Sequence, residues 1–269
     1  MYNKRIVPKI TPIASGSKGN CTLVRSENTN VLVDIGIPLF YAEDSLKKLG
    51  VNPCDIDAVL VTHEHTDHIS GVQAFCHKYN KPVYAHNAAA ARIIRQLSKL
   101  APHKIAEFYD NDFFVGDLTV SPFQLSHDAP CTGYGFSDKN GKISMLTDAG
   151  ILTDALLKSI ADSDIVLIEA NHDIDMLRSS KKYPAALKRR ILSEYGHLSN
   201  AAGGEAVAKL ASGGVARQFI LAHLSMENNY PELALSAVGS TLLRYGIKAG
   251  SDVELYVAEQ YKIGKTIFA

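Results

Sequence analysis

The stretch AVLVTHEHTDH, residues 58–68, decides the fold, because an apolar run leads directly into three histidines and an aspartate. Imidazole and carboxylate groups at this density suit a site for zinc-like ions. On a helix, His63 and His65 would point about 200° apart, since each residue turns a helix by roughly 100°. They can therefore share an ion only in a loop at the end of a strand, and residues 58–61 supply that strand.

Composition restricts the class of protein. The chain has 269 residues, enough to bury a sizeable core. Its 28 lysines and arginines balance 28 acidic residues, so a nucleic-acid partner would need a local basic patch. Four widely spaced cysteines without a C-x-x-C pair indicate reduced thiols. Neither a signal peptide nor an apolar run of the roughly 20 residues of a membrane span is visible, so we expect a cytoplasmic protein with no membrane interaction.

Short strand patterns alternate with helical patterns along the whole chain. Strands are expected over residues 6–13, 21–24, 31–36, 58–61, 83–85, 113–115, 118–120, 123–126, 134–136, 143–146, 165–168, 219–221 and 253–257. Helices are expected over residues 38–49, 68–79, 88–97, 153–160, 184–192, 199–210 and 231–245. Thr66 or Asp67 is expected to cap the second of these helices. No linker or repeat is visible, which favours a single α/β domain over residues 1–269. The pattern alone leaves open a doubly wound sheet or a sandwich of two sheets covered by helices.

The sequence HEHTDH, residues 63–68, resembles the HxHxDH signature of the metallo-β-lactamase-fold hydrolases. This resemblance implies the four-layer αββα sandwich, with metal ions between the sheet edges. Further residues match the family in order, each directly after an expected strand: Asp34, His127, Asp148 and His223. Only 75 positions separate Asp148 from His223, so there is no room for the β-CASP insertion of larger nucleases in this superfamily.

The resemblance also implies two divalent metal ions. The first ion would be bound by His63, His65 and His127, and the second by Asp67, His68 and His223. Asp148 would bridge the two ions, and Asp34 would support the histidine loop from behind. A hydroxide shared by the ions would be the nucleophile, and Asp67 would orient it. Zinc, manganese and iron all suit these ligands.

Three local features favour a phosphate-containing substrate. The first is a basic tract within residues 178–190, which contains no acid: Arg178, Lys181, Lys182, Lys188, Arg189 and Arg190. Such a tract suits a phosphate backbone, although a solvated helix face would have the same composition.

The second feature is GHLSN, residues 196–200, directly before an expected helix. A helix N-terminus offers free N–H groups that bind phosphate, and His197 and Ser199 would add donors. His197 would also protonate the leaving oxygen. A plain helix cap would explain Ser199 but not His197.

The third feature is SGSKGN, residues 15–20, in which backbone N–H groups, Ser15, Ser17 and Lys18 would approach an anion. His172, within EANHD at residues 169–173, would contact substrate or a metal ligand. Together with the metal motifs, these segments resemble the YycJ/WalJ branch of the superfamily. That branch implies a DNA nuclease with 5′-to-3′ exonuclease activity.

Our hypothesis is therefore a dinuclear metal-dependent hydrolase that cleaves phosphodiester bonds in DNA. Three alternatives remain open from the sequence. One is a small-molecule hydrolase, such as a cyclic phosphodiesterase or another hydrolase of the metallo-β-lactamase type. The others are an oxygen-using diiron enzyme and a regulatory protein that has lost catalysis. The complete set of expected ligands argues against the last of these.

Overall fold

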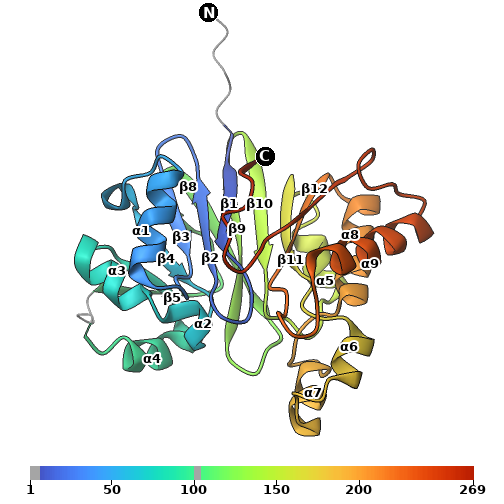
Figure 1. Cartoon of the computed structure of the whole chain (residues 1–269). Helices are drawn as coiled ribbons and strands as arrows, with labels where there is room; N and C mark the ends of the chain where they lie inside the picture. The colour runs from blue at the N-terminus through green and yellow to red at the C-terminus, as the bar shows by residue number, and fades with distance from the viewer. Residues whose placement is uncertain (1–6, 100–103) are drawn as a thin grey trace, which may run out of the picture.

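Two seven-stranded sheets pack face to face between two layers of helices in the computed structural model, which describes residues 7–99 and 104–269 (Figure 1). Helices α1 (Leu39–Lys48), α3 (Val72–Tyr79) and α4 (Asn87–Gln96) cover one outer face. Helices α5 (Asp154–Ser159), α8 (Asn200–Gly213) and α9 (Pro231–Arg244) cover the other. The expected αββα sandwich is confirmed.

The first sheet brings the histidine motif and Asp34 to one edge. Its strand order is β14-β1-β2-β3-β4-β5-β6, and β3 to β6 are parallel. Its strands are β1 (Lys9–Ala14), β2 (Cys21–Arg25), β3 (Asn30–Val33), β4 (Ala58–Val61), β5 (Val83–His86), β6 (Ile105–Phe108) and β14 (Ile267–Phe268). Because parallel strands end at the same edge of a sheet, Asp34 after β3 lies beside the residues that follow β4.

The second sheet brings the expected site residues of the second half of the chain to one edge. Its order is β13-β12-β11-β10-β9-β8-β7, and β10 to β13 are parallel. Its strands are β7 (Phe113–Val115), β8 (Leu118–Leu125), β9 (Cys131–Asp138), β10 (Gly141–Leu146), β11 (Ile165–Glu169), β12 (Gln218–Ala222) and β13 (Glu254–Val257). Asp148 follows β10, Glu169 ends β11 and His223 follows β12, so these three residues share one edge.

Strand β4 shows why the sequence forms buried sheets. All four of its residues are buried, which is typical of a parallel strand covered on both faces. Val59 and Val61 pack under the helices of the first layer. Ala58 and Leu60 face the second sheet, in the apolar core that the two sheets share. This rigid core holds the loop after β4 in place.

Several expected boundaries were wrong. The strands expected over residues 118–120 and 123–126 are one strand, β8, which continues through Pro122. At Pro122 β8 pairs with β9 alone, because β7 pairs only with Leu118–Val120, so Pro122 lies where β8 is at the edge of the sheet and proline is tolerated. Strands β6 and β14 and helix α6 (Ile174–Ser179) were not expected. Of the strand expected over residues 6–13, Ile6 lies outside the described residues, and β1 begins at Lys9.

The helix expected over residues 68–79 is also different. It divides into α2 (Thr66–Ile69) and α3, with Gly71 between them. His65 is the N-cap residue of α2 and makes no side-chain cap hydrogen bond, so neither Thr66 nor Asp67 is the cap. A Cβ atom at Gly71 would lie 2.1 Å from the Ile37 carbonyl oxygen, so this turn requires glycine. Within the described residues, no helix is long and apolar enough to span a membrane.

Candidate metal centre

The loops that carry the expected ligands have unusual backbone conformations. Among the described residues, four non-glycine residues have positive φ, and three of these are Asp34 (58°), Asp148 (63°) and His223 (57°). A non-glycine residue with positive φ costs about 1–3 kcal/mol, and such strain concentrates at functional sites. The chain therefore maintains three strained residues at the two sheet edges that face each other.

All seven expected metal ligands converge there. Nitrogen atoms of His63, His65 and His127 lie within 4.8 Å of one another, and so do ligand atoms of Asp67, His68 and His223. A carboxylate oxygen of Asp148 also lies within 4.8 Å of nitrogen atoms of His63 and His68, which are one histidine from each set. The geometry therefore places Asp148 between two clusters of three potential ligands.

Buried atoms of this cluster are unsatisfied in a way that fits divalent cations. His63 Nε2, His223 Nε2 and Asp148 Oδ2 are buried and have no hydrogen-bond partner in the described part of the chain. A buried polar atom without a partner costs about 1–3 kcal/mol. Imidazole nitrogen and carboxylate oxygen are ligands that zinc, manganese and iron accept, so bound ions would satisfy all three atoms.

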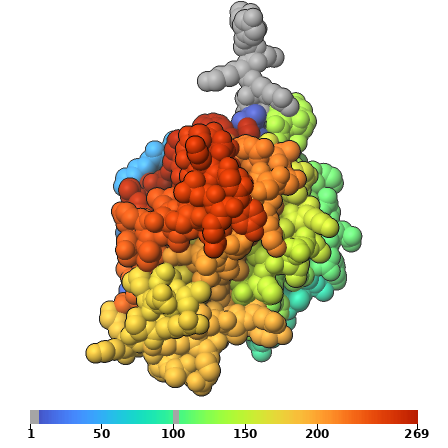
Figure 2. Space-filling view, turned by 90° about the vertical axis from the view of Figure 1, so that its right-hand side faces the viewer, coloured from blue at the N-terminus to red at the C-terminus, as the bar shows by residue number. Residues whose placement is uncertain are grey.

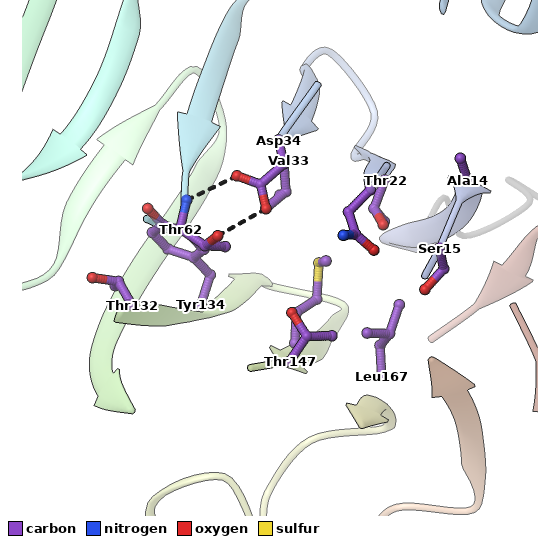
Figure 3. A pocket seen from close by; sticks show the side chains of 12 residues that line it. Ala14, Ser15, Thr22, Val33, Asp34, Thr62, Thr132, Tyr134, Thr147 and Leu167 are labelled. Atoms are coloured by element: carbon purple, nitrogen blue, oxygen red, sulfur yellow. Dashed lines mark hydrogen bonds between the residues drawn. The ribbon is translucent and has the colours of Figure 1, made fainter. Parts of the chain in front are cut away.

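Asp34 supports this cluster from behind. Its carboxylate accepts hydrogen bonds from the Thr62 backbone N–H and hydroxyl, each at 2.9 Å (Figure 3). It also lies 2.7 Å from His68 Nδ1. This contact leaves His68 Nε2 to face the cluster. Burial disfavours the charged form of His68, but Asp148 and Asp34 outweigh it and raise the pKa of His68 to about 9. The small internal cavity beside Asp34 holds about 20 Å³, room for about one water molecule but not for a substrate.

Glu169 was missed as a site residue from the sequence, although it is the most connected carboxylate of the cluster. Its Oε1 lies 2.7 Å from His223 Nδ1 and 2.8 Å from His197 Nδ1. Its Oε2 accepts the N–H groups of Ala149 and Leu198, each at 3.0 Å. Burial would raise the pKa of Glu169, but His197 and His223 outweigh it and hold the pKa well below its usual value. Glu169 thus fixes both rings with Nε2 free.

Asp128 was missed too. Its Oδ1 lies 3.2 Å from His127 Nε2 and 3.4 Å from His65 Nε2, and its Oδ2 forms an ion pair with Arg190. This carboxylate therefore links two histidines of the first cluster to the basic tract. The only sequence signal for it was its position directly after His127.

An open cavity of about 250 Å³ adjoins the expected metal ligands. It is lined by His65, Asp67, Asp148 and His223, and also by Ser17, Asn171, Tyr183, Leu187, Arg190, Ile191, His197 and Ser225. Of the residues expected to bind phosphate, the structure therefore brings Ser17 and His197 to this cavity.

The other expected phosphate contacts lie elsewhere. Ser15 is buried, and its hydroxyl accepts the His223 backbone N–H at 2.7 Å. Lys18 is exposed, and its backbone N–H donates to Gln260 Oε1 at 3.0 Å. His172 is 1% exposed, and burial lowers its pKa to about 4. None of these three side chains lines the cavity beside the metal ligands.

At the start of α8, where an anion site was expected, three backbone N–H groups have partners within the protein. Leu198 donates to Glu169, Asn200 donates to the His172 carbonyl at 2.8 Å, and Ala202 donates to the Ser199 hydroxyl at 3.2 Å. Ser199 is therefore a plain helix cap.

One end of the basic tract reaches the cavity. The tract begins with Arg178 in the last turn of α6 and continues into α7 (Ala185–Ile191), and these two helices project beyond the sheets at one end of the molecule (Figures 1 and 2). Arg190 lines the cavity while it pairs with Asp128, and Lys182 pairs with Glu227. The tract thus meets acids from other segments, although it contains none itself.

Comparisons with known proteins agree with this geometry. Residues 14–137 match the metallo-beta-lactamase superfamily. The chain is 35% identical to exodeoxyribonuclease YycJ of Bacillus anthracis, over 91% of this chain and 92% of that protein. It is 36% identical to exodeoxyribonuclease WalJ of Streptococcus pneumoniae, over 92% of this chain and 93% of that protein. The metallo-beta-lactamase fold protein YhfI of Bacillus subtilis has a similar structure, with a TM-score of 0.71, 18% identity, and coverage of 98% of this chain and 100% of that one.

The fold and the cluster of histidines and carboxylates define a hydrolase of the metallo-β-lactamase class. The chain belongs to the metallo-β-lactamase superfamily, in the branch that contains the YycJ and WalJ proteins.

Gly36 sets a structural requirement for this centre. A Cβ atom at this position would lie 1.6 Å from the Asp67 carbonyl oxygen. We expect Gly36→Ala to lower the free energy of unfolding by about 1–3 kcal/mol or more, because the loop after β3 must move away from α2. Urea unfolding measures this change in stability, and metal analysis measures whether the variant binds less metal.

Gly239→Ala is the matched control, since Gly239 lies within α9 and no heavy atom stands within 4 Å of the place that an added Cβ atom would occupy. This control is expected to stabilise the protein by about 0.5–1 kcal/mol. Unaltered unfolding and metal content in Gly36→Ala would show that the loop tolerates the added methyl group.

Proposed function

We propose that this protein is a metal-dependent exonuclease that hydrolyses phosphodiester bonds in DNA in the 5′-to-3′ direction. The observation that carries the proposal is that one cavity is lined both by metal-ligand residues and by Arg190 of the basic tract. The similarity to exodeoxyribonucleases over more than nine-tenths of the chain supports the same substrate. We also infer that residues 1–269 form one domain, since both sheets share one internal core.

Two divalent ions fit the ligand sets: His63, His65 and His127 for the first, and Asp67, His68 and His223 for the second, with Asp148 between them. We propose zinc, manganese or iron for these positions. When bound, the ions would supply Lewis acidity and lower the pKa of water. The remaining chemistry belongs to side chains of this chain.

Asp67 orients the attacking water. Its side chain is 26% exposed, and its Oδ2 lies 3.6 Å from both His68 Nε2 and His223 Nε2. Burial would raise the pKa of Asp67, but these histidines outweigh it, so the pKa lies well below its usual value and the group is a carboxylate. An ionised oxygen at the cavity can accept a hydrogen bond from water and direct its lone pair at phosphorus.

His197 protonates the leaving oxygen. Because its Nδ1 is held by Glu169 at 2.8 Å, its Nε2 is the ring nitrogen available to substrate in the cavity. As water adds to phosphorus it gives up one proton to the solvent in the open cavity, the bond to the ester oxygen breaks, and that oxygen takes the proton of Nε2. Arg190, at the same cavity, positions a non-bridging phosphate oxygen.

Charge reversal distinguishes a DNA nuclease from a small-molecule phosphodiesterase. Lys181 and Arg189 are exposed members of the basic tract and do not line the cavity. We expect the Lys181→Glu, Arg189→Glu variant to lose about tenfold or more in kcat/KM on long DNA, because phosphate contacts dominate affinity. The slope of log affinity against log salt should fall by about one per lost contact.

Turnover of bis(p-nitrophenyl) phosphate should be unaffected in that variant. The control is Lys158→Glu, Lys248→Glu, which reverses two exposed charges on the side of α5 and α9 and should leave both substrates unaffected. Equal losses on DNA and on the small ester, or equal losses in the control, would argue against DNA binding by the tract.

A further inference from the structure

A second cavity of about 210 Å³ lies next to the one that holds the metal ligands. It lies between the loop after β12 and the segment after β13, and its apolar lining comes from Leu224, Met226, Tyr230, Pro231 and Ala258. Among the described residues that line it, none is basic. The acid at its rim, Glu259, pairs with Lys262 at 2.8 Å. This cavity is therefore unsuited to phosphate.

The two cavities adjoin at Ser225, which lines both. The Ser225 hydroxyl accepts the Asn228 backbone N–H at 3.3 Å, so its own hydrogen remains available to a ligand that spans the junction. Tyr230 and Met226 are 49% and 51% exposed, so a flat aromatic ring and a flexible thioether face solvent at the second cavity.

The glycine-rich loop of residues 15–20 forms part of the wall. Gln260 lines the second cavity, donates to the Gly19 carbonyl at 2.8 Å and accepts the Lys18 N–H at 3.0 Å. A Cβ atom at Gly16 would lie 2.5 Å from Gln260 Oε1 and 3.0 Å from the Leu224 carbonyl oxygen. Glycine at this position therefore allows the loop to pack against the lining of the second cavity.

We propose that the second cavity is a subsite for the nucleobase of a nucleotide whose phosphate lies at the metal ligands. This inference rests on the proposed function. A nucleotide has a charged half and a planar apolar half, and the two adjoining cavities have the matching characters. Stacking on Tyr230 gives affinity for any base, because every base has an aromatic face. Met226 adapts to bases of different size, since its thioether is flexible and contacts aromatic rings favourably.

The subsite is tested with short DNA oligonucleotides. In these substrates, the nucleotide on each side of the scissile phosphate is made abasic in turn. For the wild-type protein, we expect kcat/KM to fall about tenfold or more with one of the two abasic substrates. Tyr230→Ala should cleave that substrate and the complete DNA at similar rates. Tyr230→Phe should discriminate like the wild type, because it keeps the aromatic ring. Tyr109→Ala, which removes an exposed ring outside the cavity, should also discriminate normally.

Equal rates on complete and abasic DNA in the wild type, or unaltered discrimination in Tyr230→Ala, would overturn the subsite while the nuclease function stands. If the wild-type protein cleaves no DNA, the proposed function fails. The subsite is then tested by measuring the binding of two small compounds. Tighter binding of deoxyadenosine monophosphate than of deoxyribose 5-phosphate, lost in Tyr230→Ala, would support it. Equal binding of the two compounds would overturn it.

Discussion

The Asp148→Asn variant is expected to lose DNA cleavage by at least about a thousandfold while it keeps the fold. Asp148 is 1% exposed, groups with His63 and His68 as potential metal ligands, and has one carboxylate oxygen without a hydrogen-bond partner among the described residues. An amide is nearly isosteric but lacks the negative charge that would balance two divalent ions. Asparagine also tolerates the positive φ of 63° at this position, so backbone strain does not confuse the result.

Cleavage of end-labelled DNA and metal content per chain are the measurements for this variant. Asp112→Asn, which removes an exposed carboxylate that does not line the cavity, is the matched control and should behave as the wild type. If Asp148→Asn cleaved DNA at a rate close to that of the wild type, Asp148 would have no role between the two ions.

The Glu169→Gln variant is expected to lower both stability and activity. Four groups meet this carboxylate, namely the Nδ1 atoms of His197 and His223 and two backbone N–H groups. An amide offers one acceptor oxygen, so its NH₂ must face either the imidazoles or the backbone donors. Breaking a buried ionic network in this way costs about 3–5 kcal/mol. Loss of support for metal-binding histidines typically lowers metal affinity about 10–100-fold.

The two histidines can be separated by experiment. Loss of support for His223 should lower metal affinity, whereas loss of support for His197 should lower kcat at saturating metal. When Glu169→Gln is added to the His197→Ala variant, it should therefore lower metal affinity but have little additional effect on kcat. Glu107→Gln, an exposed carboxylate on β6, is the control. Normal thermal unfolding, metal affinity and kcat in Glu169→Gln would contradict the role given to this residue.

The fold and the cluster of potential metal ligands could be predicted because their signals are local or periodic. Residues 63–68 place four potential ligands directly after a buried strand, and parallel strands bring Asp148 and His223 to one edge. Glu169 could not be assigned in the same way, because a carboxylate at a strand end has no pattern of its own. Its role depends on contacts with residues up to 54 positions away.

The substrate contacts were harder to predict for a related reason. Lys18 and Ser199 belong to segments that suit anions locally, but the structure uses those backbone groups internally. The cavity beside the metal ligands instead involves Tyr183 and Leu187, which carry no phosphate signal in the sequence. A cavity forms when segments that are distant in the sequence pack together. Sequence patterns identify single segments that suit a ligand, but they do not show which segments meet.

The most direct test of a metal-dependent DNA exonuclease is incubation of end-labelled single- and double-stranded DNA with the purified protein and manganese, with and without chelator. We expect stepwise shortening from the 5′ end that stops when chelator is added. Undegraded DNA from a protein that binds two ions per chain, or degradation that chelator leaves unaffected, would contradict the proposed function.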